Sequence, residues 1–166
     1  MAEDGNRFTG FLYAGLMISP QGQARVLEYN VRFGDPETQP IMMRLESDLI
    51  SLCNAAIDGK LDQVSAEWSE QTAVGVVLAA GGYPASYAKG EVIDGLDNTD
   101  DGVKVFHAGT AMKDDKVVTS GGRVLCVTAT GRNAKEAQAN AYKAVDKVGF
   151  KDMYCRRDIA HRAITE

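Results

Sequence analysis

Residues 26–39, with the sequence VLEYNVRFGDPETQ, decide how we interpret the fold. Residues 27–33 alternate between apolar and polar side chains, and the apolar ones are Leu27, Tyr29, Val31 and Phe33. A period of two is typical of a β-strand with one buried side. We therefore expect a strand whose apolar face packs into a core.

The polar face of this predicted strand carries a carboxylate, a carboxamide and a guanidinium, from Glu28, Asn30 and Arg32. Neighbouring members of the set lie about 7 Å apart along a strand. Carboxylate and amide oxygens are suitable Mg²⁺ ligands, and a guanidinium suits a phosphate group. The strand then runs into a turn with two more carboxylates, Asp35 and Glu37. These residues indicate either a magnesium and phosphate site or an ordinary edge strand with a mixed polar face.

The composition of the 166-residue chain is that of a globular protein, with 45% hydrophobic and 25% charged residues. A net charge of −5 and the lack of a basic run argue against a nucleic-acid partner. No apolar run reaches the roughly 18 residues of a membrane span, so we expect no membrane contact. Three cysteines without a CxxC pair, and no signal peptide, favour a cytoplasmic location.

Around the opening stretch, the sequence predicts a hairpin followed by a helix. The expected strands cover residues 11–18 and 24–33, joined by turn residues at 19–23. From Thr38, apolar side chains recur every three or four residues and predict one helix that ends near residue 58. A helix start next to the turn would favour a bound phosphate.

The second half of the chain is predicted to be rich in β-structure. Polar residues 61–71 are expected to form a linker, with Trp68 as a packing anchor. An acidic loop is expected at 94–101, and Asn133 is expected to cap the long helix. The expected elements are strands at 72–80, 90–93, 103–112, 117–119, 123–130 and 150–157 and a helix at 133–148.

Other candidate sites are weaker. The chain has no Gly-x-Ser-x-Gly motif and no complete phosphate loop, so neither a serine hydrolase nor a P-loop enzyme is indicated. The pairs Gly81-Gly82 and Gly121-Gly122 predict tight turns or bulges. His107 is interpreted as structural, and Arg156-Arg157 as a solvated pair with an anion site as the alternative.

The stretch RFGDPETQ at 32–39 resembles the signature of the phosphoribosylamine–glycine ligase family of purine biosynthesis. Five further segments resemble this family in the same order, and the similarity covers essentially the whole chain. They are TGFLYAGLM (9–17), QPIM (39–42), AAGGYP (79–84), VFHAGT (105–110) and GGRVLCVT (121–128).

The resemblance implies an α+β fold that joins two parts. Residues 1–60 would be the end of an ATP-grasp domain, with a β-hairpin and a helix. Residues 61–71 would be the linker, and residues 72–166 a β-rich C-terminal domain with one long helix.

The resemblance also implies an ATP-dependent carbon–nitrogen ligase. Such an enzyme joins glycine to 5-phosphoribosylamine through a glycyl phosphate and gives glycinamide ribonucleotide, with ATP as co-substrate and Mg²⁺ or Mn²⁺ as the metal. The implied metal ligands are Glu28 and Asn30, and the implied nucleotide contacts are Arg32 and Gly34. Arg32 would also stabilise developing phosphate charge, and Asp35 and Glu37 would orient the amino groups of the substrates.

The chain departs from the family in what it lacks. The family's N-terminal domain and most of its ATP pocket have no counterpart here, so we expect the chain to be inactive alone. The missing lobe would be supplied in cis or in trans. Two alternatives stay open: one chain of a split ligase, and a non-catalytic binding or scaffold module that has kept the fold.

Overall fold

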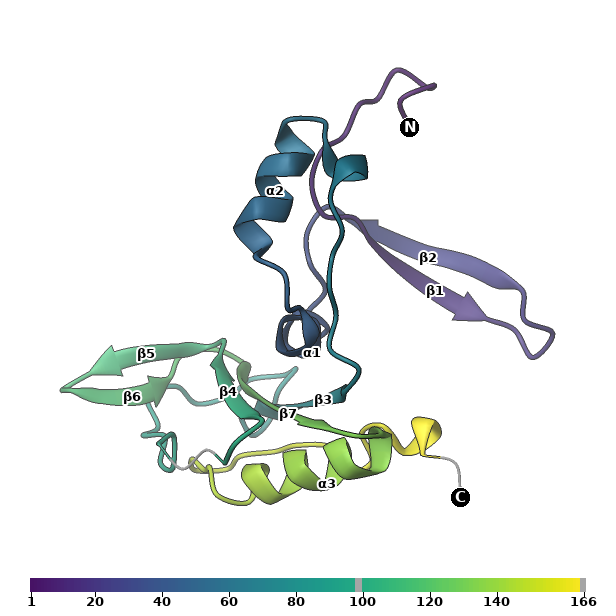
Figure 1. Ribbon diagram of the computed structural model, residues 1–166. Coiled ribbons are helices and arrows are strands. Elements are labelled where there is room, and N and C mark those ends of the chain that lie inside the picture. The colour runs from purple at the N-terminus through teal and green to yellow at the C-terminus, as the bar shows by residue number, and fades with distance from the viewer. Residues whose placement is uncertain (98–99, 165–166) are drawn as a thin grey trace. The chain divides into compact units, whose positions relative to one another are not determined.

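A computed structural model describes residues 1–97 and 100–164, and the chain forms two compact units (Figure 1). The first unit comprises Met1–Thr38 and Leu45–Trp68, and the second comprises Gln39–Arg44 and Ser69–Glu166. Helices and antiparallel strands are both present, which confirms the predicted α+β class. Among the described residues, no helix has the length and apolar character needed to cross a bilayer.

The first unit begins with the predicted hairpin, made of β1 (Tyr13–Ile18) and β2 (Ala24–Asn30). The register pairs the first residue of β1 with the last residue of β2, and it shifts at a bulge between Gly15 and Leu16. Strand β2 ends at Asn30, three residues before the predicted end of the strand.

The apolar face of β2 is exposed, so the prediction that it is buried is wrong for this chain. Leu27 is 65% exposed and Tyr29 60%, and Val31, directly after β2, is 69% exposed. Apolar side chains of β1, including Met17 at 57%, are exposed as well. The alternation is present, but no described residue covers these side chains.

The predicted single helix is two helices, α1 (Thr38–Arg44) and α2 (Leu49–Ile57). Between them, Leu45 forms an isolated β-bridge with Trp68. The Asp48 carboxylate then accepts a hydrogen bond from the backbone N–H three residues on, at 2.6 Å, and caps α2. Trp68 is 46% exposed, so its indole is only partly packed as an anchor. A 3-10 helix, Leu61–Gln63, follows α2.

The second unit is built on a three-stranded antiparallel sheet and a separate two-stranded hairpin. The sheet has the order β3-β7-β4, with β3 at Thr72–Ala79, β4 at Val103–His107 and β7 at Arg123–Gly131. The hairpin consists of β5 (Thr110–Lys113) and β6 (Lys116–Thr119). The predicted strand 103–112 is therefore divided, because His107 still pairs with Leu125 of β7 whereas Thr110 pairs with Thr119 of β6.

The strands predicted at 90–93 and 150–157 are not formed as strands. Each segment makes only isolated bridges, namely Val92 with Val118 and Tyr154 with Ala79. The two segments therefore touch β6 and β3 at single points instead of adding strands. In the acidic loop, residues 98 and 99 lie outside the described residues.

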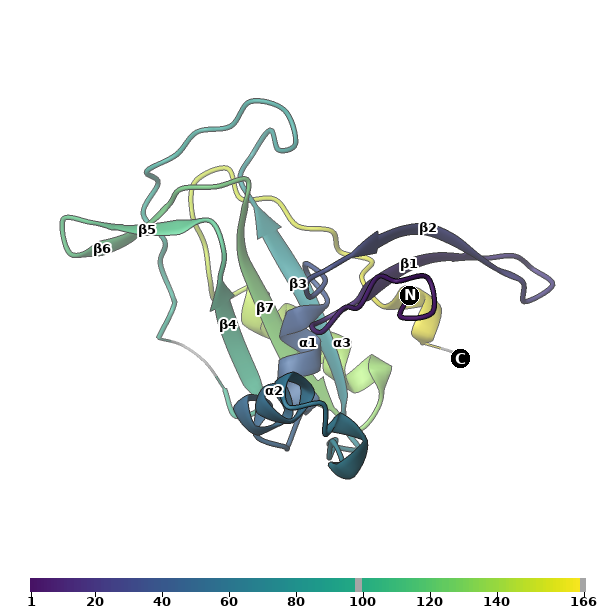
Figure 2. The same ribbon diagram turned by 90° about the horizontal axis from the view of Figure 1, so that it is seen from above.

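Helix α3 (Ala134–Val145) covers one face of the sheet, and Asn133 caps it as predicted. Its alanines meet Val76, Leu78 and Val127 in a core that is closed to solvent. Residues 39–44 of α1 lie on the opposite face, where the Pro40 ring packs against Gly75. Figures 1 and 2 show α3 and α1 on the two sides of β3 and β7. A final 3-10 helix, His161–Ala163, closes the described chain.

Candidate functional site

The two predicted metal ligands lie side by side at the end of β2. Glu28 and Asn30 are two residues apart on one strand, so their side chains leave the same face. The Asn30 Nδ2 group donates a hydrogen bond to Glu28 Oε1 at 3.1 Å. Gly15 pairs with Glu28 across the hairpin, and a Cβ there would lie 3.2 Å from Glu28 Cγ. The glycine therefore leaves room for the carboxylate.

The donor set of this pair fits a hard divalent cation shared with a phosphate. Glu28 Oε2 and Asn30 Oδ1 remain as oxygen ligands beside the hydrogen bond. Mg²⁺ is commonly held by one or two carboxylates together with substrate phosphates. Within residues 1–97 and 100–164, no group of three or more His, Cys, Asp or Glu side chains forms a complete cage. The pair therefore suits a metal ion whose remaining coordination positions are filled by a bound phosphate.

The turn after β2 is compact, and a glycine in it leaves room for neighbouring side chains. Thr38 donates hydrogen bonds to the Gly34 carbonyl, from its backbone N–H at 3.2 Å and from its hydroxyl. Gly34 is buried, and a Cβ there would overlap the Glu37 carboxylate and the Tyr13 ring. Asp35 and Glu37 themselves are exposed on this turn.

Tyr13 connects this turn to the strand pair. Its hydroxyl donates a hydrogen bond to Glu37 Oε1 at 3.2 Å, and its backbone pairs with Asn30 across the hairpin. The negative charge of Glu37 raises the pKa of the Tyr13 phenol above its ordinary value, and the hydrogen bond adds to this shift. Glu28 raises the same pKa and Arg32 lowers it, so all three charges act on this hydroxyl.

Sequence analysis did not select Tyr13. The signal was present, because an antiparallel hairpin with its turn near residues 19–23 places residue 13 close to Asn30. The identity of the pair depends on the bulge at Gly15, and such a bulge cannot be inferred from the alternation alone.

Arg32 lies beyond the end of β2 and is exposed. Its Nη1 group donates to the carbonyl of Phe33 at 2.7 Å, and the Phe33 ring stacks on Phe11 with centroids 3.9 Å apart. The guanidinium thus binds its own backbone, whereas Glu28 and Asn30 bind each other. The roles predicted for all these site residues stay predictions: Glu28 and Asn30 as metal ligands, and Arg32, Gly34, Asp35 and Glu37 in nucleotide and substrate binding.

Comparisons with known proteins match both halves of the chain. The family model described as phosphoribosylglycinamide synthetase, C domain, matches residues 73–162. The one described as phosphoribosylglycinamide synthetase, ATP-grasp (A) domain, matches residues 1–38. The second match contains the strand pair and most of the turn.

Single proteins that are similar to this chain have the same family description. The phosphoribosylamine–glycine ligase of Vibrio cholerae is 62% identical over 165 residues, which are 99% of this chain and 38% of the relative. That of Escherichia coli strain K12 is 57% identical and is covered to 39%. The crystal structure of the Thermotoga maritima phosphoribosylamine–glycine ligase superposes with a TM-score of 0.79 at 39% identity, over 95% of this chain and 38% of that one.

Proposed function

Because the chain belongs to the phosphoribosylglycinamide synthetase family, we propose that it is the C-terminal part of an ATP-dependent ligase. The proposed reaction joins glycine to 5-phosphoribosylamine and yields glycinamide ribonucleotide through a glycyl phosphate. The chain spans about 38% of the length of the Vibrio cholerae relative. The reaction therefore needs the remaining lobes, and we expect this chain to be inactive alone.

The observation that carries the proposal is the adjacency of Glu28 and Asn30 within the segment matched by the ATP-grasp model. These two side chains would hold Mg²⁺ or Mn²⁺ through hard oxygen atoms. When bound there, the metal would neutralise charge on the ATP phosphates. The Tyr13–Glu37 bond supports the proposal further, because it fixes the turn next to the pair.

Arg32 and Gly34 are the proposed nucleotide contacts. Arg32 is exposed at the end of β2, where its guanidinium can face developing negative charge. Gly34 would contribute through its backbone, because the Glu37 carboxylate and the Tyr13 ring fill the place of its side chain. Asp35 and Glu37 are exposed carboxylates on the same turn and would orient the amino groups of the two substrates by charge-assisted hydrogen bonds.

The exposed apolar side chains of β1 and β2 support the proposal that another protein segment packs on them. We propose that the remainder of the ATP-grasp domain, supplied in cis or in trans, covers them. In this proposal residues 1–60 end the ATP-grasp domain, residues 61–71 are the linker and residues 72–166 form the C-terminal domain. The proposed location is the cytoplasm, in keeping with three cysteines, Cys53, Cys126 and Cys155, that form no disulfide with one another.

Complementation tests this function. The chain would be mixed with the N-terminal portion of the Vibrio cholerae relative that its match leaves uncovered, and ADP formation would be followed. We expect ADP release that depends on both glycine and phosphoribosylamine, with none from either part alone. If the parts bind each other but release no ADP, the chain would be a non-catalytic scaffold module and the ligase proposal would fail.

Glu28→Ala gives a sharper prediction in the same mixture. Removal of one of two metal ligands should lower turnover by about a hundredfold while the apparent KM for glycine changes much less. Glu3→Ala removes an exposed carboxylate outside the site and is the matched control. Equal turnover for the two variants would refute the metal assignment.

A further inference from the structure

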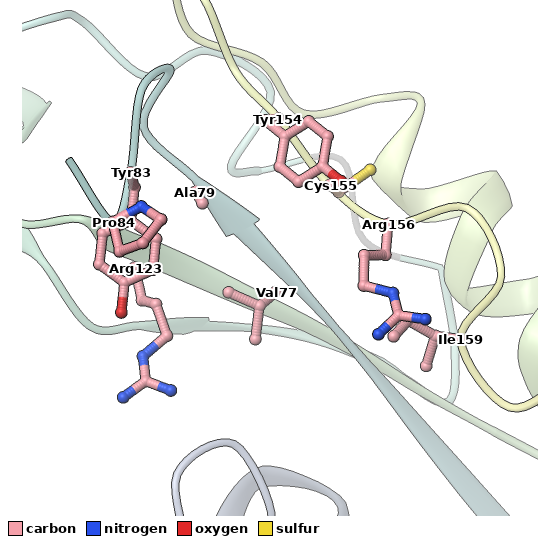
Figure 3. Close-up of a pocket in the computed structure, with 9 residues that line it drawn as sticks. All are labelled: Val77, Ala79, Tyr83, Pro84, Arg123, Tyr154, Cys155, Arg156 and Ile159. Carbon is pink, nitrogen blue, oxygen red and sulfur yellow. The ribbon is translucent and has the colours of Figure 1, made fainter. Parts of the chain in front are cut away.

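A pocket of about 380 Å³ in the second unit is lined in part by β3 and by the segment after residue 153 (Figure 3). Ala79 and Tyr154 exchange backbone hydrogen bonds at its edge, at 2.8 and 2.9 Å. The Arg156 guanidinium in its wall binds the Asp158 carboxylate through Nε and Nη2, at 2.9 and 2.7 Å. These contacts hold the C-terminal segment in place and have a structural role. The turn at residues 34–38, in contrast, holds side chains of the proposed site.

Thr38 closes this turn. Its backbone N–H donates to the Gly34 carbonyl at 3.2 Å, and its hydroxyl donates to the same oxygen. Both donors of one residue therefore bind a single acceptor four positions earlier, and the loop between them contains only residues 35–37. Thr38 is half-buried, whereas the Asp35 and Glu37 side chains on the loop are exposed. The hydroxyl is thus in contact with the backbone of the turn, and the carboxylates are directed outwards.

The place of the Glu37 carboxylate depends on where the Gly34 backbone lies. A Cβ at Gly34 would overlap this carboxylate, so the two groups are in close contact. The Tyr13 hydroxyl holds Glu37 Oε1 from the other strand at 3.2 Å. A displacement of the Gly34 carbonyl would therefore reach Glu37 directly.

The two ends of the turn are fixed in different ways. At its entry, the Phe33 ring stacks on the Phe11 ring with centroids 3.9 Å apart. At its exit, the hydrogen bonds of Thr38 to Gly34 close the loop. Loss of the hydroxyl would leave the backbone N–H of Thr38 as the donor to this carbonyl, so the exit would be held more loosely.

We propose that Thr38 is a positioning residue, whose hydroxyl fixes the turn that presents the carboxylates of Asp35 and Glu37. The inference rests on the proposed function, in which these carboxylates orient the amino groups of glycine and 5-phosphoribosylamine. Small displacements of orienting groups lower the rate of a reaction strongly. Because Thr38 acts on these two carboxylates, its hydroxyl should matter for the two amine substrates and much less for ATP.

Thr38→Val tests the inference, since it removes the hydroxyl and keeps a branched side chain of similar size. In the mixture with the N-terminal portion of the Vibrio cholerae relative, kcat/KM for glycine and for phosphoribosylamine should fall by about tenfold. The KM for ATP should stay within about twofold of the parent value. Thr38→Ser keeps a hydroxyl and should restore the parent constants. Thr9→Val removes an exposed threonine hydroxyl outside the turn and is the matched control.

The kinetic outcomes separate the inference from the proposed function. Equal constants for Thr38→Val and Thr38→Ser in an active mixture would overturn the inference and leave the ligase proposal in place. A loss that affects ATP as strongly as the amine substrates would also overturn it, because the role of Thr38 would then be a general structural one. A parent mixture that releases no ADP would refute the proposed function, and the inference with it.

A second measurement uses the 166-residue chain alone. Tyr13 lies 24 residues from Glu37 in sequence, so the NMR signals of its ring report the position of the turn and not the nearby substitution. Thr38→Val should shift these ring signals, and Thr38→Ser should leave them in place. Unchanged signals in a folded Thr38→Val variant would overturn the inference. If Thr38→Val failed to fold, shifted Tyr13 signals in Thr38→Ser would overturn it instead.

Discussion

At the scale of single residues, Tyr13 links the turn at residues 34–38 to the Glu28–Asn30 pair. Its hydroxyl holds Glu37 while its backbone pairs with Asn30, so a displacement of either strand would move both. The phenol has no predicted chemical step of its own. We therefore regard Tyr13 as a positioning residue, and its ionisation reports the geometry of the turn.

Glu37→Gln should lower the pKa of Tyr13 towards its ordinary value, because the carboxylate charge is the largest cause of the upward shift. A raised pKa in the folded state stabilises the fold below the unfolded pKa of about 10 and loses this effect as the pH rises through the folded value. The variant should therefore lose less stability at alkaline pH. The measurement is the phenolate absorbance of the chain minus that of Tyr13→Phe.

Glu3→Gln serves as the control for this titration, since it removes an exposed carboxylate outside the turn. A Tyr13 midpoint that is the same in the parent chain and in Glu37→Gln would show that the Glu37 charge does not raise the pKa of Tyr13.

Residue-level prediction succeeded where it depended on strand geometry alone. A period of two places Glu28 and Asn30 on one face, and their hydrogen bond agrees with this. Arg32 follows the end of β2, where the period no longer applies. Its rotamer is set by the nearby carbonyl of Phe33, and no sequence pattern encodes such a contact.

At the scale of elements, the cap of α3 is a local interaction that supports the main core. The Asn133 side chain accepts a hydrogen bond from the Glu136 N–H at 2.9 Å. Asn133→Ala should lower the free energy of unfolding by about 1 kcal/mol, because one N–H of the first turn loses its partner. The measurement is urea unfolding followed by amide signals of β7.

Asn133→Asp keeps an oxygen acceptor at the same place and should stay within a few tenths of a kcal/mol of the parent chain. Equal losses of stability in the alanine and aspartate variants would mean that the cap itself contributes nothing.

Element prediction failed where a long-range contact interrupts a local pattern. The helical period continues from residue 38 to 58, yet the bridge between Leu45 and Trp68 divides it into α1 and α2. Asp48 is a residue type that caps helices and could have indicated the start of a second helix. The apolar spacing, however, continues past it without a break. The pattern at 103–112 is likewise divided, because its first part pairs with β7 and its last part with β6.

At the scale of the whole molecule, the alternation in β2 predicts a buried apolar face, but no described part of this chain buries it. Alternation records which side chains face an apolar neighbour, and it does not record which chain segment supplies that neighbour. Leu27, Tyr29 and Val31 keep the pattern but stay exposed. The Vibrio cholerae relative is more than twice as long as this chain. We propose that the additional part of such a protein covers these side chains.

Leu27→Glu tests whether the N-terminal portion of the relative packs on this hairpin. Because Leu27 is 65% exposed, the substitution should change the stability of the chain alone by less than about 0.5 kcal/mol. Binding to the N-terminal portion of the Vibrio cholerae relative should weaken by about tenfold or more, since a buried leucine contributes about 1.5–3 kcal/mol. Calorimetric titration of the two parts measures the affinity, with Gln21→Glu at the exposed hairpin tip as control. If both variants bind equally well, the hairpin is not the surface on which the missing lobe packs, and the exposed apolar residues need another partner.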